Sequence, residues 1–273
     1  MIRLIACDLD ETLLNDEKNV SLKNYEAIKQ FERQGGIFVP CTGRLYTGLK
    51  RTLTQLDAWQ QAGHYVISTN GALISENTGK VLYSNGVDIE KAFALIAYGR
   101  EHGIGMEVFT GSGVLYYENL DAKEERDLPL FIEGAKPLPQ DYSFLKGQVI
   151  PKMLYERQDM AYLQSFAKQM PQALKEDLEI SFSSDRYIEL NKAGVHKGSG
   201  LAILAELLGV TMEEIMAIGD NYNDVGMLKT AGFSVAVANA PADIQQLCDH
   251  VCIHTYQEDA VAEAIAYVLS NQI

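Results

Sequence analysis

Short apolar runs alternate with stretches of helical periodicity in the first and last parts of the chain. After Ser21, for example, Leu22, Tyr25, Ile28 and Phe31 recur every three residues, which predicts a helix that Ser21 caps and that ends near residue 34. Such alternation is typical of parallel βαβ units. The pattern predicts strands at residues 2–7, 37–41, 65–68, 215–218 and 234–237, and further helices at 198–208, 222–230 and 259–269.

The rhythm changes between about residues 79 and 187. Two apolar runs flank the turn Gly111-Ser112-Gly113 and predict a β-hairpin over residues 106–110 and 114–117. Helices are expected at 89–102 and 159–168, and strands at 151–155, 178–182 and 187–190. The fold class expected is therefore α/β, with a doubly wound, Rossmann-like parallel core of residues 1–82 and 188–273. An inserted α/β domain is expected at residues 83–187.

Two aspartates, Asp8 and Asp10, directly follow the first apolar strand. Ligands of open α/β sheets bind beyond the carboxyl ends of the strands. Two carboxylates there would repel each other unless a cation were present, and Mg²⁺ suits carboxylates, phosphate oxygens and water. An Asx-type turn that merely caps the loop explains the same two residues equally well.

Three more segments follow predicted strands or begin predicted helices. Thr42-Gly43-Arg44 follows the second apolar run and supplies a hydroxyl and backbone N–H groups. Lys197 begins a helix, where its charge opposes the helix dipole unless an anion lies there, although a surface lysine would be the ordinary interpretation. Residues 219–224 supply carboxylates and amides where another helix begins, and a simple N-cap accounts for only one of them.

Taken together, these segments resemble the motifs of the haloacid dehalogenase-like phosphohydrolase superfamily, and more closely those of its Cof-like branch. Glu11 departs from the pattern, because glycine is most frequent there, which should affect loop packing more than chemistry. The matching segments, in order, are Asp8-Leu9-Asp10-Glu11-Thr12, Thr42-Gly43-Arg44, Lys197 and Gly219-Asp220-Asn221-Tyr222-Asn223-Asp224.

The resemblance implies a phosphatase of small phosphorylated metabolites, most often sugar phosphates, with the inserted domain as a cap over the substrate. Asp8 would attack phosphorus and form an aspartyl-phosphate, and Asp10 would act as general acid and then base. Mg²⁺ would be held by Asp8, the Asp10 carbonyl and Asp220, while Asp224 would pair with Lys197 or a metal-bound water. The phosphate oxygens would be bound by Leu9 N–H, Thr42, Gly43 N–H, Lys197 and Asn223.

Three other functions remain open on the same motifs. A phosphomutase would return the phosphoryl group from the same aspartate to a sugar. A receiver-like signalling module would only accept phosphate on aspartate, although Asp10 and about 100 inserted residues argue against it. A non-catalytic regulator that binds phosphosugars ranks last, because every expected catalytic group is present. The physiological substrate, the oligomeric state and the choice between Mg²⁺ and Mn²⁺ stay open.

The composition of the chain limits the kinds of binding partner that can be expected. Lys+Arg 23 against Asp+Glu 37 gives a net charge of −14, which disfavours nucleic acid as a partner. No apolar run approaches the roughly 20 residues of a membrane span, and the N-terminus lacks a signal-peptide pattern, so a cytoplasmic protein without membrane association is expected.

The cysteines do not form a disulfide pattern. Cys7 and Cys41 lie in apolar runs and are expected in the core. Residues with zinc-binding side chains occur at every second position in Cys248, His250, Cys252 and His254, a pattern that suggests a zinc site. Because alternate residues of one strand form a line rather than a tetrahedron, the sequence disfavours zinc there.

Overall fold

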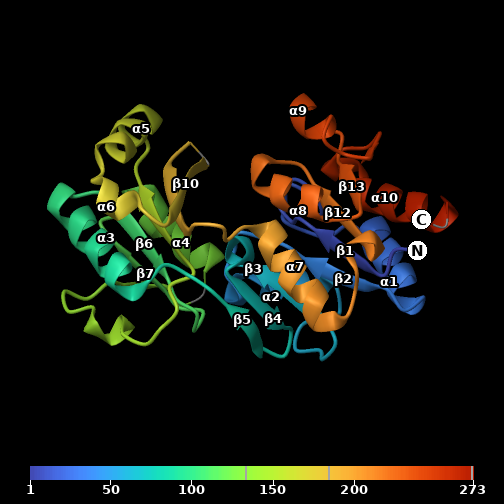
Figure 1. Cartoon of the computed structure of the whole chain (residues 1–273), viewed down its shortest axis with the longest axis horizontal. Helices are drawn as coiled ribbons and strands as arrows, with labels where there is room; N and C mark the ends of the chain where they lie inside the picture. The colour runs from blue at the N-terminus through green and yellow to red at the C-terminus, as the bar shows by residue number, and fades with distance from the viewer. Residues whose placement is uncertain (133, 184, 272) are drawn as a thin grey trace. The chain divides into compact units, whose positions relative to one another are not determined.

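The computed structural model describes the chain except for residues 133, 184 and 272, and divides into two compact units. Unit 1 comprises Met1–Tyr83 and His196–Ile273, and unit 2 comprises Ser84–Val195 (Figure 1). The expected second boundary, at residue 187, falls at the first residue of a strand. That strand, β11 (Tyr187–Lys192), is hydrogen-bonded to two strands of unit 2, and this pairing explains why unit 2 continues beyond residue 187.

Unit 1 contains a five-stranded parallel sheet in the order β14-β13-β12-β1-β2. From β1 the chain proceeds outward to β2 on one side, whereas β12, β13 and β14 follow one another on the other side. The strand order therefore reverses between β1 and β12, which is the place where such sheets bind ligands. The strands are β1 (Leu4–Cys7), β2 (Ile37–Pro40), β12 (Ile215–Gly219), β13 (Phe233–Ala236) and β14 (His250–Val251).

Helices cover both faces of this sheet, as a doubly wound fold requires. Along β1, Leu4 and Ala6 pack against α7 and α8, whereas Ile5 and Cys7 pack in the core that α1 and α10 share. The expected helix at 222–230 is a 3₁₀ turn, η5 (Tyr222–Asp224), followed by α8. The helices of this unit are α1 (Leu22–Arg33), α2 (Lys50–Gln55), α7 (Lys197–Leu208), α8 (Val225–Thr230), α9 (Ala242–Gln245) and α10 (Ala260–Asn271).

A small three-stranded sheet follows β2 and α2 in the chain. It consists of β3 (Tyr65–Ser68), β4 (Leu73–Glu76) and β5 (Val81–Ser84), of which only β3 was expected. A parallel bridge between Cys41 and Ile67 joins β3 to the end of β2. Cys7 and Cys41 are both fully buried, so the expectation that they belong to the core is confirmed.

Unit 2 is built on a six-stranded sheet in the order β10-β11-β9-β6-β7-β8. The pairs are antiparallel apart from β7 with β8, and the hairpin of β6 and β7 matches the expected one. Its strands are β6 (Gly105–Phe109), β7 (Leu115–Glu118), β8 (Lys136–Pro137), β9 (Lys152–Glu156), β10 (Leu178–Ser183) and β11. Its helices are α3 (Ile89–His102), α4 (Ala122–Phe131), α5 (Met160–Gln169) and α6 (Gln172–Lys175).

Candidate active site

The first two site residues follow neighbouring strands at the point where the strand order reverses. Asp8 comes directly after β1 and Asp220 directly after β12, and Cys7 is paired in register with Ile218. The backbone N–H of Asp8 donates to the carbonyl of Ile218 over 3.0 Å, so the ladder continues to the edge of the sheet. Two residues far apart in sequence are thereby placed side by side.

A third carboxylate joins them from η5. One oxygen each of Asp8, Asp220 and Asp224 lie within 4.8 Å of one another, and all three residues are buried. Asp224 folds back to accept hydrogen bonds from the N–H groups of Asp220 and Asn221, at 3.0 and 3.1 Å. A Cβ at Gly219 would lie 2.6 Å from the Cβ of Asp224, so glycine makes this fold-back possible.

Lys197, the first residue of α7, places its charge among these carboxylates. Its Nζ lies 2.5 Å from Asp8 Oδ1 and 2.6 Å from Asp224 Oδ1, and its side chain is fully buried. Burial alone would lower the pKa of Lys197, but Asp224 and Asp8 raise it above its usual value, so the ammonium stays charged. Lys197 is one of the two partners that the sequence predicts for Asp224.

One ammonium does not balance three buried carboxylates. Burial and the Asp224 carboxylate raise the pKa of Asp8, although Lys197 opposes the shift. The same two causes raise the pKa of Asp220 to about 7. Thr12 Oγ1 donates a hydrogen bond to Asp220 Oδ1 over 2.8 Å, and this bond opposes the rise. A hard divalent cation would relieve this repulsion, and an all-oxygen donor set is the kind that Mg²⁺ accepts. The residues therefore fit the expected metal.

Asp10 is engaged in a different set of contacts. Its carboxylate forms ion pairs with the Arg44 guanidinium and with Lys18, whose Nζ lies 2.8 Å away. Arg44 Nε also donates to Asp10 Oδ2 over 2.8 Å. Burial alone would raise the pKa of Asp10, but these two cations hold it below its usual value. Sequence reasoning quoted Arg44 as part of a motif but assigned it no contact, and it did not single out Lys18.

The expected phosphate-binding residues occupy the same edge of the sheet. Thr42 is buried after β2, where its hydroxyl accepts a hydrogen bond from Arg44 N–H over 3.2 Å. Leu9 is buried, whereas Gly43 is partly exposed and Asn223 in η5 is exposed. Thr12 was quoted without a role, and its hydrogen bond to Asp220 could have been suspected only because it belongs to the same motif as Asp8.

The backbone conformation at Glu11 explains why glycine is frequent at this position. Its φ is 59°, in the left-handed region that a side chain disfavours. Its carbonyl accepts a hydrogen bond from Asn239 Nδ2 over 2.9 Å, which ties this loop to the chain that follows β13. The departure thus changes the loop's backbone energy while Asp8 and Asp10 keep their places.

Comparison with known proteins decides the family. The sequence profile of the haloacid dehalogenase-like hydrolases matches residues 5–265. The chain belongs to this family. The phosphatase YwpJ of Bacillus subtilis (strain 168) is 31% identical over 98% of this chain and 100% of its own length. A second relative from the same strain, the 5-amino-6-(5-phospho-D-ribitylamino)uracil phosphatase YwtE, is 30% identical over 99% of both chains.

Solved structures agree with this membership. A haloacid dehalogenase-like hydrolase from Bacteroides thetaiotaomicron superposes with a TM-score of 0.85 at 28% identity, over 98% of this chain and 100% of that chain. The expected family, its hydrolase class and the α/β fold are therefore confirmed, and the names of the relatives agree with the expectation of a phosphatase. Among the described helices, none has the length and apolar character that crossing a membrane would need.

Proposed function

We propose that this haloacid dehalogenase-like hydrolase is a Mg²⁺-dependent phosphatase that hydrolyses phosphomonoesters of small metabolites. One observation carries the proposal. Three buried carboxylates and one buried ammonium, from three separate segments of the chain, converge where the strand order reverses. A purely structural cluster would leave an excess of negative charge buried, which is costly unless a cation binds. The predicted family roles of Asp8, Asp220, Asp224 and Lys197 account for all four of these charges.

In this proposal Asp8 is the nucleophile. Its carboxylate attacks phosphorus in line, the P–O bond to the leaving alcohol breaks, and an aspartyl-phosphate forms. Water then attacks the phosphorus of this intermediate, which releases inorganic phosphate and restores the carboxylate. Lys197 is proposed to hold the transferring oxygens as their negative charge spreads, and its distance of 2.5 Å from Asp8 Oδ1 supports this role. Thr42, Gly43, Leu9 N–H and Asn223 are proposed to bind the same oxygens.

Asp10 is proposed to protonate the leaving oxygen and then to deprotonate the attacking water. Its ion pairs with Arg44 and Lys18 favour the carboxylate form, which suits the second step. For the first step Asp10 must carry a proton, so at least part of this pairing must loosen when substrate binds. Arg44 therefore adjusts the proton affinity of the acid–base residue.

The metal is proposed to be Mg²⁺, held by Asp8, Asp220 and the backbone carbonyl of Asp10. When bound, the cation offsets the repulsion between the carboxylates and the substrate phosphate. Asp224, hydrogen-bonded to two backbone N–H groups, positions Lys197 through the 2.6 Å contact to Oδ1. Its second oxygen is occupied by those N–H groups, which supports a positioning role.

For the substrate we propose phosphorylated sugars or sugar alcohols, with unit 2 as the cap that selects among them. The name of the YwtE relative specifies a phosphorylated ribityl compound, which supports this class without identifying the compound. A phosphoryl group on a polyol presents the tetrahedral anion that the Asp8 site requires. The cytoplasmic location expected from the sequence remains a prediction beside this proposal.

A panel of phosphorylated metabolites, assayed with Mg²⁺ and again with EDTA, tests the proposal. Release of inorganic phosphate that EDTA abolishes and Mg²⁺ restores is the expected result. An isomerised sugar phosphate without net phosphate release would instead identify a phosphomutase. Saturable binding of a phosphosugar with no turnover across the panel would favour the non-catalytic regulator.

A further inference from the structure

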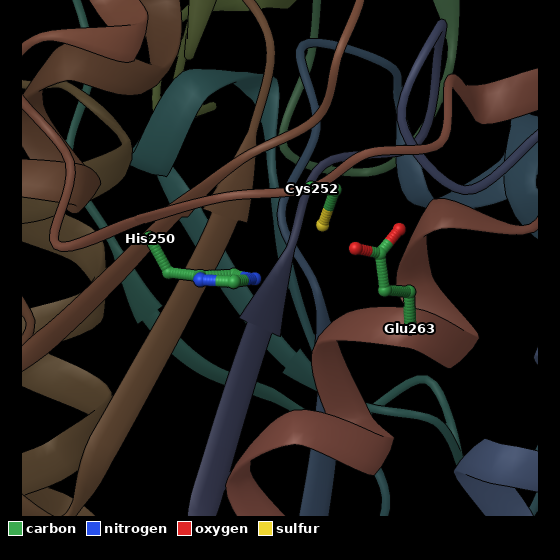
Figure 2. Close-up of side chains that lie close together, drawn as sticks. All are labelled: His250, Cys252 and Glu263. Carbon is green, nitrogen blue, oxygen red and sulfur yellow. The ribbon is translucent and has the colours of Figure 1, made fainter.

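A second cluster of ligand-type side chains lies at the outer edge of the unit 1 sheet. His250 is in β14, Cys252 follows that strand, and Glu263 lies in the first turn of α10. One nitrogen, one sulfur and one oxygen of these residues lie within 4.8 Å of one another. Figure 2 shows the imidazole ring, the thiol and the carboxylate directed toward a common space.

His250 presents a nitrogen that nothing else in the described chain satisfies. Its Nε2 is buried and has no hydrogen-bond partner among the described residues. The ring is stacked on Tyr267 of α10, with centroids 4.1 Å apart and planes 19° apart, so its direction is fixed by packing. In Figure 2 the far end of the ring points toward Cys252 and Glu263. A buried nitrogen without a partner is costly, and a bound ion would satisfy it.

Glu263 is held as a carboxylate on the opposite side. Its Oε1 accepts the N–H of Ile253 at 2.9 Å, and its Oε2 accepts the N–H of His254 at 3.0 Å. The Nδ1 of His254 lies 2.8 Å from the same Oε2. Burial alone would raise the pKa of Glu263, but these donors hold it below its usual value. The carboxylate is thus charged and oriented before any ion arrives.

Cys252 completes the set from within the core. It is buried, and its Sγ donates a long hydrogen bond of 3.5 Å to the carbonyl of Ala260. Ile253 and His254 beside it are exposed, so the cluster lies next to solvent that can deliver an ion. The sequence disfavoured zinc because alternate residues of one strand form a line. In the structure, Glu263 of α10 supplies a ligand atom that does not lie on the strand, so the three ligand atoms need not form a line.

We propose that His250 Nε2, Cys252 Sγ and the Glu263 carboxylate bind one Zn²⁺ ion, with water in the fourth position. Imidazole, thiolate and carboxylate are the ligands of this borderline-soft cation, whereas Mg²⁺ avoids sulfur. The thiol of Cys252 loses its proton to solvent as the Zn–S bond forms. His254 contacts Oε2 of Glu263 through its ring nitrogen and so keeps this carboxylate in position. The ion would tie the edge strand β14 to α10, so the site stabilises unit 1.

Cobalt titration of the metal-free full-length protein tests the site, because Co²⁺ replaces Zn²⁺ and its bond to a thiolate absorbs in the near ultraviolet. Excess Mg²⁺ is included to occupy the Asp8 cluster. We expect a charge-transfer band that saturates at about one Co²⁺ per chain and that Zn²⁺ abolishes. Cys252→Ser should lose the band, while Cys248→Ser, on the same segment but outside the cluster, should keep it.

Two further variants keep the test decisive if Cys252→Ser folds poorly. Glu263→Gln should abolish or strongly weaken binding, and His254→Ala, at an exposed residue, should weaken it about tenfold. Zn²⁺ should also raise the Tm of the wild type and of Cys248→Ser but not of Cys252→Ser. A band that survives Cys252→Ser, or folded wild-type protein with no saturable Co²⁺ binding, would overturn the proposal. Activity is not the readout, so failure here leaves the proposed phosphatase function untouched.

Discussion

Two clusters in the same unit place ligand-type atoms equally close together, yet they differ in chemistry and in origin. The cluster of Asp8, Asp220 and Asp224 is built entirely of oxygen and contains an internal cation, Lys197. The cluster of His250, Cys252 and Glu263 mixes nitrogen, sulfur and oxygen. The first set suits a hard cation beside a phosphate, and the second suits Zn²⁺. Proximity of ligands is therefore common to both, and donor type separates their proposed functions.

The origin of the residues differs as well. Asp8 and Asp220 directly follow neighbouring parallel strands where the strand order reverses, so the topology of the sheet brings these two carboxylates together, and Asp224 joins them from the turn η5 just beyond. The second cluster depends on how α10 packs against β14. The stacking of Tyr267 from α10 on His250 from β14 is part of this packing. A site made by strand ends can be expected from sequence, whereas a site made by side-chain packing between a helix and an edge strand cannot.

The largest expected effect separates the two clusters by function. Asp8→Asn removes the proposed nucleophile and should lower kcat by about 10⁴-fold or more. The Co²⁺ band assigned to Cys252 should stay unchanged in this variant. Steady-state phosphate release measures the first effect, with Asp57→Asn, an exposed carboxyl of unit 1, as the control. Near-normal turnover of Asp8→Asn would remove the basis for treating the oxygen cluster as catalytic.

The internal cation of the oxygen cluster provides the next test. Lys197→Met leaves the buried carboxylates without their ammonium, and the free energy of unfolding should fall by about 4 kcal/mol. Mg²⁺ should then stabilise the variant more than the wild type, because it replaces part of the lost charge. Urea denaturation with and without Mg²⁺ measures both effects. Lys23→Met, whose side chain is 77% exposed, should change little. Equal stability of Lys197→Met and wild type would contradict the account of the charges.

Unit 2 contains a buried acid, Glu107, that belongs to neither cluster. Burial raises the pKa of Glu107 to about 8, helped by Glu124 and opposed by Lys152. The folded state therefore binds a proton more tightly than the unfolded state, whose carboxyl titrates near 4.5. The stability that this proton provides is fully present below about pH 4.5 and is lost as pH rises through about 8.

Glu107→Gln should remove that dependence. Relative to the variant, the wild type should lose stability on the order of 5 kcal/mol across this range of pH. Chemical denaturation at several pH values measures the difference, with Glu90→Gln, at an exposed position, as the control. A difference between wild type and Glu107→Gln that stays constant with pH would show that Glu107 is ionised in the fold.

The smallest expected effect concerns Asp10. Arg44→Ala removes one of the two cations that lower its pKa, so the pKa of Asp10 should rise. Carboxyl ¹³C titration by NMR follows this shift, and Asp10→Asn assigns the signal. Arg51→Ala, whose exposed guanidinium contacts Asn19, should leave the titration in place. An unmoved Asp10 signal in Arg44→Ala would mean that the ion pair does not control this carboxyl.

Much of the fold and of the oxygen cluster follows from residues that can be read directly. Apolar runs located β1, β2 and β12, and the acidic residues after two of them identified Asp8 and Asp220. The contacts of Asp10 with Lys18 and Arg44 could not be foreseen, because they depend on loop conformations near a left-handed Glu11. Glu263 lacked any spacing relation to His250 and Cys252, so only the packing of α10 could reveal it.

The most direct test of the central claim is to look for phosphate on Asp8 itself. Wild-type enzyme in turnover with an active phosphomonoester and Mg²⁺ is quenched in acid, digested, and its peptides are mapped by mass spectrometry. A phosphoryl group is expected on Asp8 of the wild type, and none is expected in Asp8→Asn or in samples quenched after EDTA. A phosphoryl group on another residue, or none on Asp8 while turnover continues, would contradict the central claim.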